Sequence, residues 1–221
     1  IFYISKINPE IINYRMIVKP YELNKVKSDL KFFLFYGKNE GLKNQHIKEL
    51  LDKNNNSNNI KYDEKDILEN EDIFFESILS NSLFESEKNI IINRCTDKIY
   101  KIVTNLIERK INGITIVINS SMLEKKSKLR KLFEKEKNLV CIATYPDTNE
   151  TLSNLALVFF KKIKVAISQQ NINLIVDKCG GDRLNLENEL EKIKIYLSNK
   201  KNISTEEILK LINLSENHTF S

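Results

Sequence analysis

The segment YGKNEGLKNQ, residues 36–45, follows an apolar run and contains glycine and lysine, the residue types of phosphate-binding loops. A P-loop has four residues between its two glycines and then Lys-Ser or Lys-Thr. Its backbone N–H groups surround the phosphates and its hydroxyl holds magnesium. Gly37 and Gly41 are only four positions apart, and Lys38 comes too early for the motif. The spacing therefore predicts a degenerate loop that binds no nucleotide.

The apolar run NIIINRC, residues 89–95, is the place where a second part of a nucleotide site would lie. Such a strand needs acidic residues at its end to hold magnesium. This run ends in Asn93, Arg94 and Cys95, and the nearest carboxylate, Asp97, stands alone two residues beyond it. We therefore predict no metal, no cofactor and no catalytic residue.

The histidines and cysteines do not suggest another chemistry. His46 and His218 are the only histidines, and His46 lies in a charged segment where we expect it to be solvated. Cys95, Cys141 and Cys179 are far apart, odd in number and flanked by apolar residues. This pattern indicates buried free thiols in a reducing compartment rather than a zinc site or a disulfide framework.

The charge of the chain permits contact with nucleic acid but does not require it. The 221 residues are 41% hydrophobic and 29% charged, with a net charge of +5. Residues 125–137 form a basic run that predicts a short helix with a solvated face. The alternative is a nucleic-acid-binding module whose contacts would come from Lys125, Lys126, Lys128, Arg130 and Lys131.

The sequence shows no sign of a membrane or of secretion. No apolar stretch approaches the roughly 18–20 residues of a membrane span. Residues 1–15 lack the charged start, apolar middle and small-residue cleavage site of a secretion signal. We expect a cytoplasmic protein.

Short apolar runs alternate with amphipathic segments from Met16 to Pro146. Strands that are apolar throughout and separated by helices imply a mostly parallel sheet covered on both faces. We therefore predict a doubly wound α/β domain over residues 16–146, after an N-terminal extension of residues 1–15. The predicted strands are 31–37, 89–95, 113–119 and 138–146, with a short one within 59–66, and the predicted helices are 41–53, 70–84, 97–110 and 125–137.

After Pro146 the pattern becomes helical, which predicts a small, lid-like helical domain over residues 147–221. An α/β domain followed by a small helical domain is the arrangement of AAA+ ATPases, here with a degenerate nucleotide site. The predicted helix-end signals are the N-caps Ser168 and Asp182, the pair Gly180-Gly181, and the capping box of Ser204 with Glu207.

The segment SILSNSLFESEKNIIINRC, residues 77–95, passes from an apolar helix into charged residues and then into a strand. At about 100° per residue, Leu83 lies at the edge of the buried stripe, whereas Phe84 falls on the opposite side, beside Ile73. Either the helix ends before Phe84 and is tucked under the next strand, or the ring projects away from the core. A projecting ring would form an apolar knob that docks into a partner's pocket.

Several segments together resemble one family. They are MIVKPYEL followed by FFLFYGKNEGLKNQHIKELL, then ILSNSLFESEKNIIINR, and then GGDRLNLENELEKIKIYL followed by ISTEEILKLI. In this order and at these distances, residues 16–221 resemble the delta subunit of the bacterial DNA polymerase III clamp loader. The resemblance implies an AAA+-like fold without a working nucleotide site.

The resemblance also implies partners and a binding site. The family works in a loader beside ATPase subunits and a delta-prime subunit, and it opens one interface of the ring-shaped sliding clamp for loading on primed DNA. By position, Leu83 and Phe84, preceded by Ser82, would enter a hydrophobic pocket on the clamp. The family's C-terminal collar domain would begin where this chain stops, so we expect it to be absent here. Direct contact with the primed DNA is expected to be weak.

One alternative from a different class is an active AAA+-type ATPase, and another is the basic nucleic-acid-binding module described above.

Overall fold

The computed structural model describes residues 30–52, 58–81, 88–109, 111, 113–198 and 200–213. Two compact units are present. The first comprises the described residues up to Gly37 together with His46–Thr144. The second comprises Lys38–Gln45 together with the described residues from Tyr145 onward. The segment that directly follows the first strand therefore belongs, by its contacts, with the helices of the second unit.

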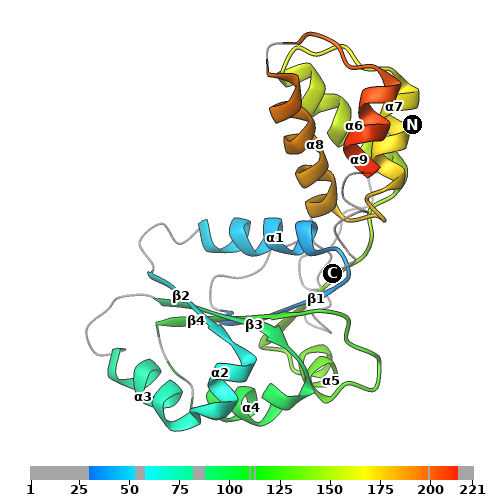
Figure 1. Ribbon diagram of the computed structural model, residues 1–221. Coiled ribbons are helices and arrows are strands. Elements are labelled where there is room, and N and C mark those ends of the chain that lie inside the picture. The colour runs from blue at the N-terminus through cyan, green and yellow to red at the C-terminus, as the bar shows by residue number, and fades with distance from the viewer. Residues whose placement is uncertain are drawn as a thin grey trace, which may run out of the picture. The chain divides into compact units, whose positions relative to one another are not determined.

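In the described residues, the first unit is built on one sheet of five parallel strands (Figure 1). The strands are β1 (Phe32–Gly37), β2 (Asn58–Asp63), β3 (Lys88–Cys95), β4 (Ile114–Ser120) and β5 (Leu139–Thr144), in the order β2-β3-β4-β1-β5. The predicted parallel sheet is confirmed.

Helices cover both faces of this sheet, which explains why its strands are apolar at almost every position. The second half of α1 (Glu40–Asp52) packs Ile47, Leu50 and Leu51 on the face that contains Phe33 and Phe35. The opposite face is covered by α2 (Glu64–Glu69), α3 (Glu71–Asn81), a 3₁₀ turn (Asp97–Ile99) with α4 (Tyr100–Glu108), and α5 (Lys128–Lys135).

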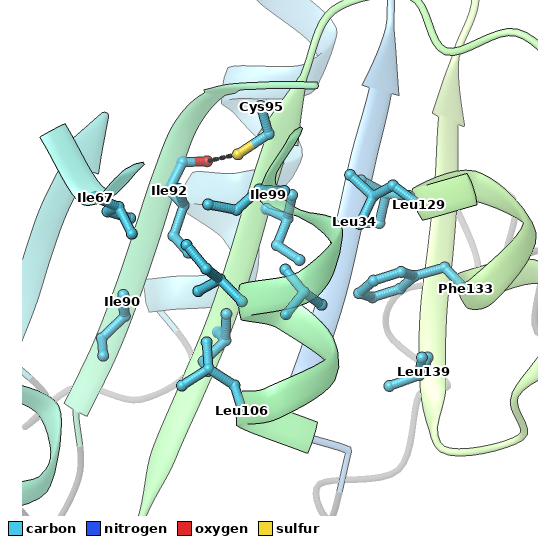
Figure 2. Close-up of a cluster of buried hydrophobic side chains, with 14 of the residues drawn as sticks. Leu34, Ile67, Ile90, Ile92, Cys95, Ile99, Leu106, Leu129, Phe133 and Leu139 are labelled. Carbon is cyan, nitrogen blue, oxygen red and sulfur yellow. Dashed lines mark hydrogen bonds between the residues drawn. The ribbon is translucent and has the colours of Figure 1, made fainter. Parts of the chain in front are cut away.

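The core of that opposite face consists of buried apolar side chains. Figure 2 shows Leu129 and Phe133 of α5 and Leu106 of α4 among the side chains of the strands. Leu34 on the central strand β1 has no exposed surface. The doubly wound arrangement therefore buries β1 on both sides.

The second unit contains α6 (Asn149–Lys162), α7 (Gln169–Asp177), α8 (Arg183–Leu197) and α9 (Thr205–Asn213) around their own apolar core. The predicted caps are confirmed. Ser168 accepts a hydrogen bond from Asn171 N, and Asp182 accepts one from Leu184 N. Ser204 and Glu207 bond each other's backbone N–H groups. Gly180 and Gly181 both have positive φ.

Two elements differ from prediction. The helix α2 was not predicted, because its six residues are too few to show a helical period. The basic helix α5 begins at Lys128 rather than at 125, because Ser127 caps it by accepting a hydrogen bond from Arg130 N. Lys125 and Lys126 therefore precede the helix and do not belong to its face.

Among the described residues, none of the helices has both the length and the apolar character needed to cross a membrane.

Candidate functional site

The N-terminus of α1 is the position at which a P-loop protein holds phosphate, because the first N–H groups of a helix have no partner within it. In this chain protein oxygens occupy those groups. The Asp182 carboxylate accepts hydrogen bonds from Glu40 N at 2.7 Å and from Gly41 N at 3.2 Å. The Asn39 side-chain oxygen accepts one from Leu42 N at 3.0 Å. The first turn of α1 is therefore already satisfied by the protein itself.

The first half of α1 also contains a lysine that the spacing argument did not identify. Counted from Gly37, the P-loop spacing places Leu42 at the second glycine, Lys43 at the lysine and Asn44 at the hydroxyl residue. Lys43, rather than Lys38, is thus the residue to compare with a P-loop lysine. Its side chain is only 1% exposed, and its Nζ lies 2.7 Å from the Glu40 carboxylate. Leu42 stands where a P-loop has its second glycine, and Asn44 stands where a P-loop has the hydroxyl residue that binds magnesium.

A polar network holds Asp182 and its neighbours in place. Arg183 binds both oxygens of Asp147, with Nε at 2.7 Å and Nη2 at 3.0 Å. Asp147 also accepts a hydrogen bond from the buried Asn39 side chain at 2.9 Å. Asn39 in turn accepts one from Arg183 N. The start of α8 is thereby linked to the start of α1 through side chains on both.

Gly41 allows the backbones of α1 and α8 to approach closely. A Cβ atom at this position would lie 2.2 Å from Leu184 N and 2.7 Å from the carbonyl carbon of Arg183. Both are backbone atoms, which cannot turn aside as a flexible side chain can. A residue larger than glycine therefore does not fit here without separating the two helices.

The carboxylates near the ends of β2 and β3 cap helices. Asp97 accepts hydrogen bonds from Ser127 Oγ, Lys128 N and Leu129 N at the start of α5. Burial opposes ionisation of Asp97, but these hydrogen bonds outweigh it and lower its pKa. The buried Glu64 likewise accepts from Thr96 N at 2.7 Å. In the residues that the structure describes, no group of three or more His, Cys, Asp or Glu side chains is placed to hold a metal ion.

The cysteines are buried and free, as predicted. Burial raises the pKa of Cys95 far above its ordinary range, that of Cys141 to about 12 and that of Cys179 to about 11. The thiolate is the reactive form of cysteine, so none of these thiols is a nucleophile near neutral pH.

The prediction for His46 was wrong. The residue is 7% exposed rather than solvated, and its Nδ1 lies 3.0 Å from the Glu49 carboxylate.

The predicted clamp-binding residues Ser82, Leu83 and Phe84 lie outside the described residues, so their assignment stays a prediction. The helix that precedes them is described. On α3, Phe74 is 3% and Ile78 is 1% exposed, whereas Ile73 is 65% exposed. The predicted buried stripe and its exposed opposite side are confirmed for these three positions.

A pocket of about 390 Å³ lies beside this exposed side of α3. Its wall is formed by β2, α2 and α3 and includes Tyr62, Ile73 and Phe74. Inside it, the Tyr62 hydroxyl lies 3.1 Å from Ser77 Oγ. Ile73 therefore offers an exposed apolar surface on α3, the helix that precedes Leu83 and Phe84 in the sequence.

At least one cation of the basic run, Arg130, is engaged in contacts within the protein. Arg130 pairs with Glu134 at 2.7 Å and donates to the Leu123 carbonyl oxygen at 3.1 Å. Its guanidinium also lies over the Tyr36 ring. These internal contacts hold Arg130 against its own unit and away from an external phosphate.

Comparisons with known proteins identify the fold. Neither the models of protein families nor the curated protein sequences gave a match. The structure is similar to the RuvB Holliday junction branch migration motor of Thermotoga maritima, with a TM-score of 0.57 and 12% identity, covering 88% of this chain and 64% of that one. It is also similar to domain III of the replication initiation protein DnaA from Thermotoga maritima, with a TM-score of 0.55 and 14% identity, covering 87% of each chain.

The clamp loader delta protein YqeN of Bacillus subtilis matches with a TM-score of 0.45 and 12% identity, covering 86% of this chain and 60% of that one. The chain spans less than two thirds of the RuvB chain. At these identities the comparisons show an AAA+-like fold, with an α/β sheet followed by helices.

Proposed function

We propose that this chain is a non-catalytic, AAA+-like subunit of a DNA polymerase III clamp loader, of the delta type. It binds the sliding clamp through Leu83 and Phe84 and opens one of the clamp's interfaces for loading on primed DNA. The ATPase subunits and the delta-prime subunit of the loader would be its neighbours. The observation that carries the proposal is a Ser-Leu-Phe segment that directly follows α3 in the sequence, in an AAA+-like fold in which the protein itself occupies the first N–H groups of α1.

The environment of α3 supports docking by the residues that follow it in the sequence. Phe74 and Ile78 fix one side of the helix in the core, and Ile73 shows that the opposite side faces solvent. Arg109 lies over the Phe75 ring, 4.6 Å from its centroid, which holds the middle of the helix against α4. A docking element needs such a rigid support, because ordering a flexible one on binding would cost affinity.

The same features weigh against an active ATPase. A phosphate group would have to displace the Asp182 carboxylate from two N–H groups of α1. It would also have to break the ion pair between Lys43 and Glu40 before it could bind the lysine. No hydroxyl stands at position 44 to hold magnesium. ATP would therefore act on the loader only through its other subunits.

Binding and opening are separate tasks. Transfer of a leucine and a phenylalanine side chain from water into a pocket contributes roughly 1.5–3 kcal/mol each, which is enough for a binding hot spot. Opening requires more, because a ligand shifts an equilibrium only through its different affinity for the two states. The chain must therefore bind the open clamp more tightly than the closed one.

The proposal is tested by measuring the Kd of the full chain for the sliding clamp of the same organism. Leu83→Ala combined with Phe84→Ala should weaken binding by about 100-fold or more, at ~1.4 kcal/mol for each factor of ten. The melting temperature should stay near that of the unsubstituted protein, because the two side chains are proposed to face outward.

Ile73→Ala is the matched control, since it removes an exposed apolar side chain from α3, the helix that precedes Leu83 and Phe84 in the sequence. It should leave the Kd within a factor of about three. Unchanged clamp binding by the double variant, or its unfolding, would contradict the proposal.

A further inference from the structure

The N-terminus of α1 contains an anion in this structure, and that anion is a side chain of the protein. Both carboxylate oxygens of Asp182 take part, one accepting from Glu40 N at 2.7 Å and the other from Gly41 N at 3.2 Å. We propose that Asp182 is an internal substitute for a phosphate group, which keeps α1 and α8 joined without any nucleotide. The proposal concerns Lys38–Gln45 and the helices of the second unit, and it does not depend on clamp binding.

The chemistry of the site favours an anion over a neutral group. The first N–H groups of a helix carry a partial positive charge, so a carboxylate there is stabilised by both charge and hydrogen bonding. In this chain the occupant is the Asp182 carboxylate, which lies 2.7 Å from Glu40 N and 3.2 Å from Gly41 N. Phosphate oxygens bind the same groups in P-loop proteins.

Asp182 is not placed there merely to cap its own helix. Its Oδ1 accepts from Leu184 N at 2.7 Å, which already satisfies the start of α8. A serine or asparagine would serve that role equally well. The additional reach of both oxygens to Glu40 and Gly41 is what an N-cap does not require.

The surroundings are built for this contact. Gly41 permits a backbone approach that a Cβ atom at 2.2 Å from Leu184 N would forbid. Arg183, the next residue, does not compete for Asp182, because its guanidinium is held by both oxygens of Asp147. The Asp182 carboxylate therefore stays available to the backbone N–H groups of α1.

The test is a melting experiment on the full chain with Asp182→Ser. Serine keeps the cap of α8 but removes the charge and one acceptor oxygen. Loss of the two charged hydrogen bonds should lower the melting temperature by about 5 °C or more. Millimolar inorganic pyrophosphate, compared with sodium chloride at equal ionic strength, should then raise the melting temperature of this variant by several degrees more than that of the unsubstituted chain.

Asp177→Ser is the matched control, because Asp177 lies in the same unit and accepts an exposed hydrogen bond from Asn149 Nδ2 at 3.2 Å. It should melt within about 2 °C of the unsubstituted chain and respond to pyrophosphate no more than that chain does. A pyrophosphate response of Asp182→Ser no larger than that of the control would overturn the proposal.

If Asp182→Ser does not fold, Asp182→Asn decides the matter. Asparagine keeps one acceptor oxygen and the cap of α8 but has no charge. It should melt below the unsubstituted chain, and an unchanged melting temperature would contradict the role of the charge.

Discussion

Two helices of this protein begin in the same chemical way and differ in what that beginning means. At α5, the local cap Ser127 is joined by Asp97, which accepts from Lys128 N and Leu129 N. At α1, the local cap Asn39 is joined by Asp182, which accepts from Glu40 N and Gly41 N. Each helix thus combines its own polar cap with a carboxylate from a distant part of the chain.

The difference lies in where the two helices stand in the fold. The start of α5 is an ordinary helix start, and Asp97 there simply stabilises it. The start of α1 follows the central strand β1 and is the phosphate site of P-loop proteins. The carboxylate at the start of α5 therefore has a structural role only. The carboxylate at the start of α1 is proposed to stand in for a phosphate group.

The largest effect on the start of α1 is expected from a substitution of Gly41. Alanine usually stabilises a helix relative to glycine by about 1 kcal/mol. Here we expect Gly41→Ala to destabilise the protein by about 2–3 kcal/mol, because its Cβ would meet the backbone of α8 at 2.2 Å. The measurement is urea unfolding.

Asn44→Ala is the control, as an exposed position on the same helix with no such close approach. It should change the free energy of unfolding by no more than about 0.5 kcal/mol. Equal stability of the two variants would show that α1 and α8 do not approach as described.

The α5 side of the comparison is tested with Asp97→Ala. Loss of a helix-capping carboxylate at this exposed position should cost about 1 kcal/mol at neutral pH. The pKa of Asp97 is lowered in the folded protein, so its stabilisation is present above the ordinary aspartate range and is lost as the pH falls through the lowered pKa.

The difference in unfolding free energy between Asp97→Ala and the unsubstituted chain should therefore shrink as the solution is acidified. A difference that is constant from neutral to acidic pH would contradict the capping role. Pyrophosphate should not restore the stability of Asp97→Ala, because Asp97 does not occupy a phosphate site. This result would distinguish the start of α5 from the start of α1.

Local patterns in the sequence were enough to predict most of the fold. The apolar runs indicated the strands, including β1, which contains Leu34. The predicted caps Ser168 and Ser204 lie at the starts of α7 and α9. These features depend on residues a few positions apart. The short helix α2 escaped because six residues contain less than two turns.

The site was harder to predict because its parts are far apart in the sequence. Asp182 was identified as a cap for its own helix, but its bonds to Glu40 and Gly41 span about 140 residues and have no local signal. Lys43 could have been found by counting from Gly37 alone rather than by requiring two glycines. The proposed docking pair, Leu83 and Phe84, still depends on the helix period and on the family resemblance.

The proposed function requires this chain to bind a sliding clamp without using nucleotide itself. The most direct test is the Kd of the full chain for the clamp, measured by titration with and without magnesium-ATP. We expect tight binding with the same Kd in both conditions, because the Asp182 carboxylate occupies the start of α1. Absence of binding, or binding that ATP strengthens tenfold or more, would contradict it.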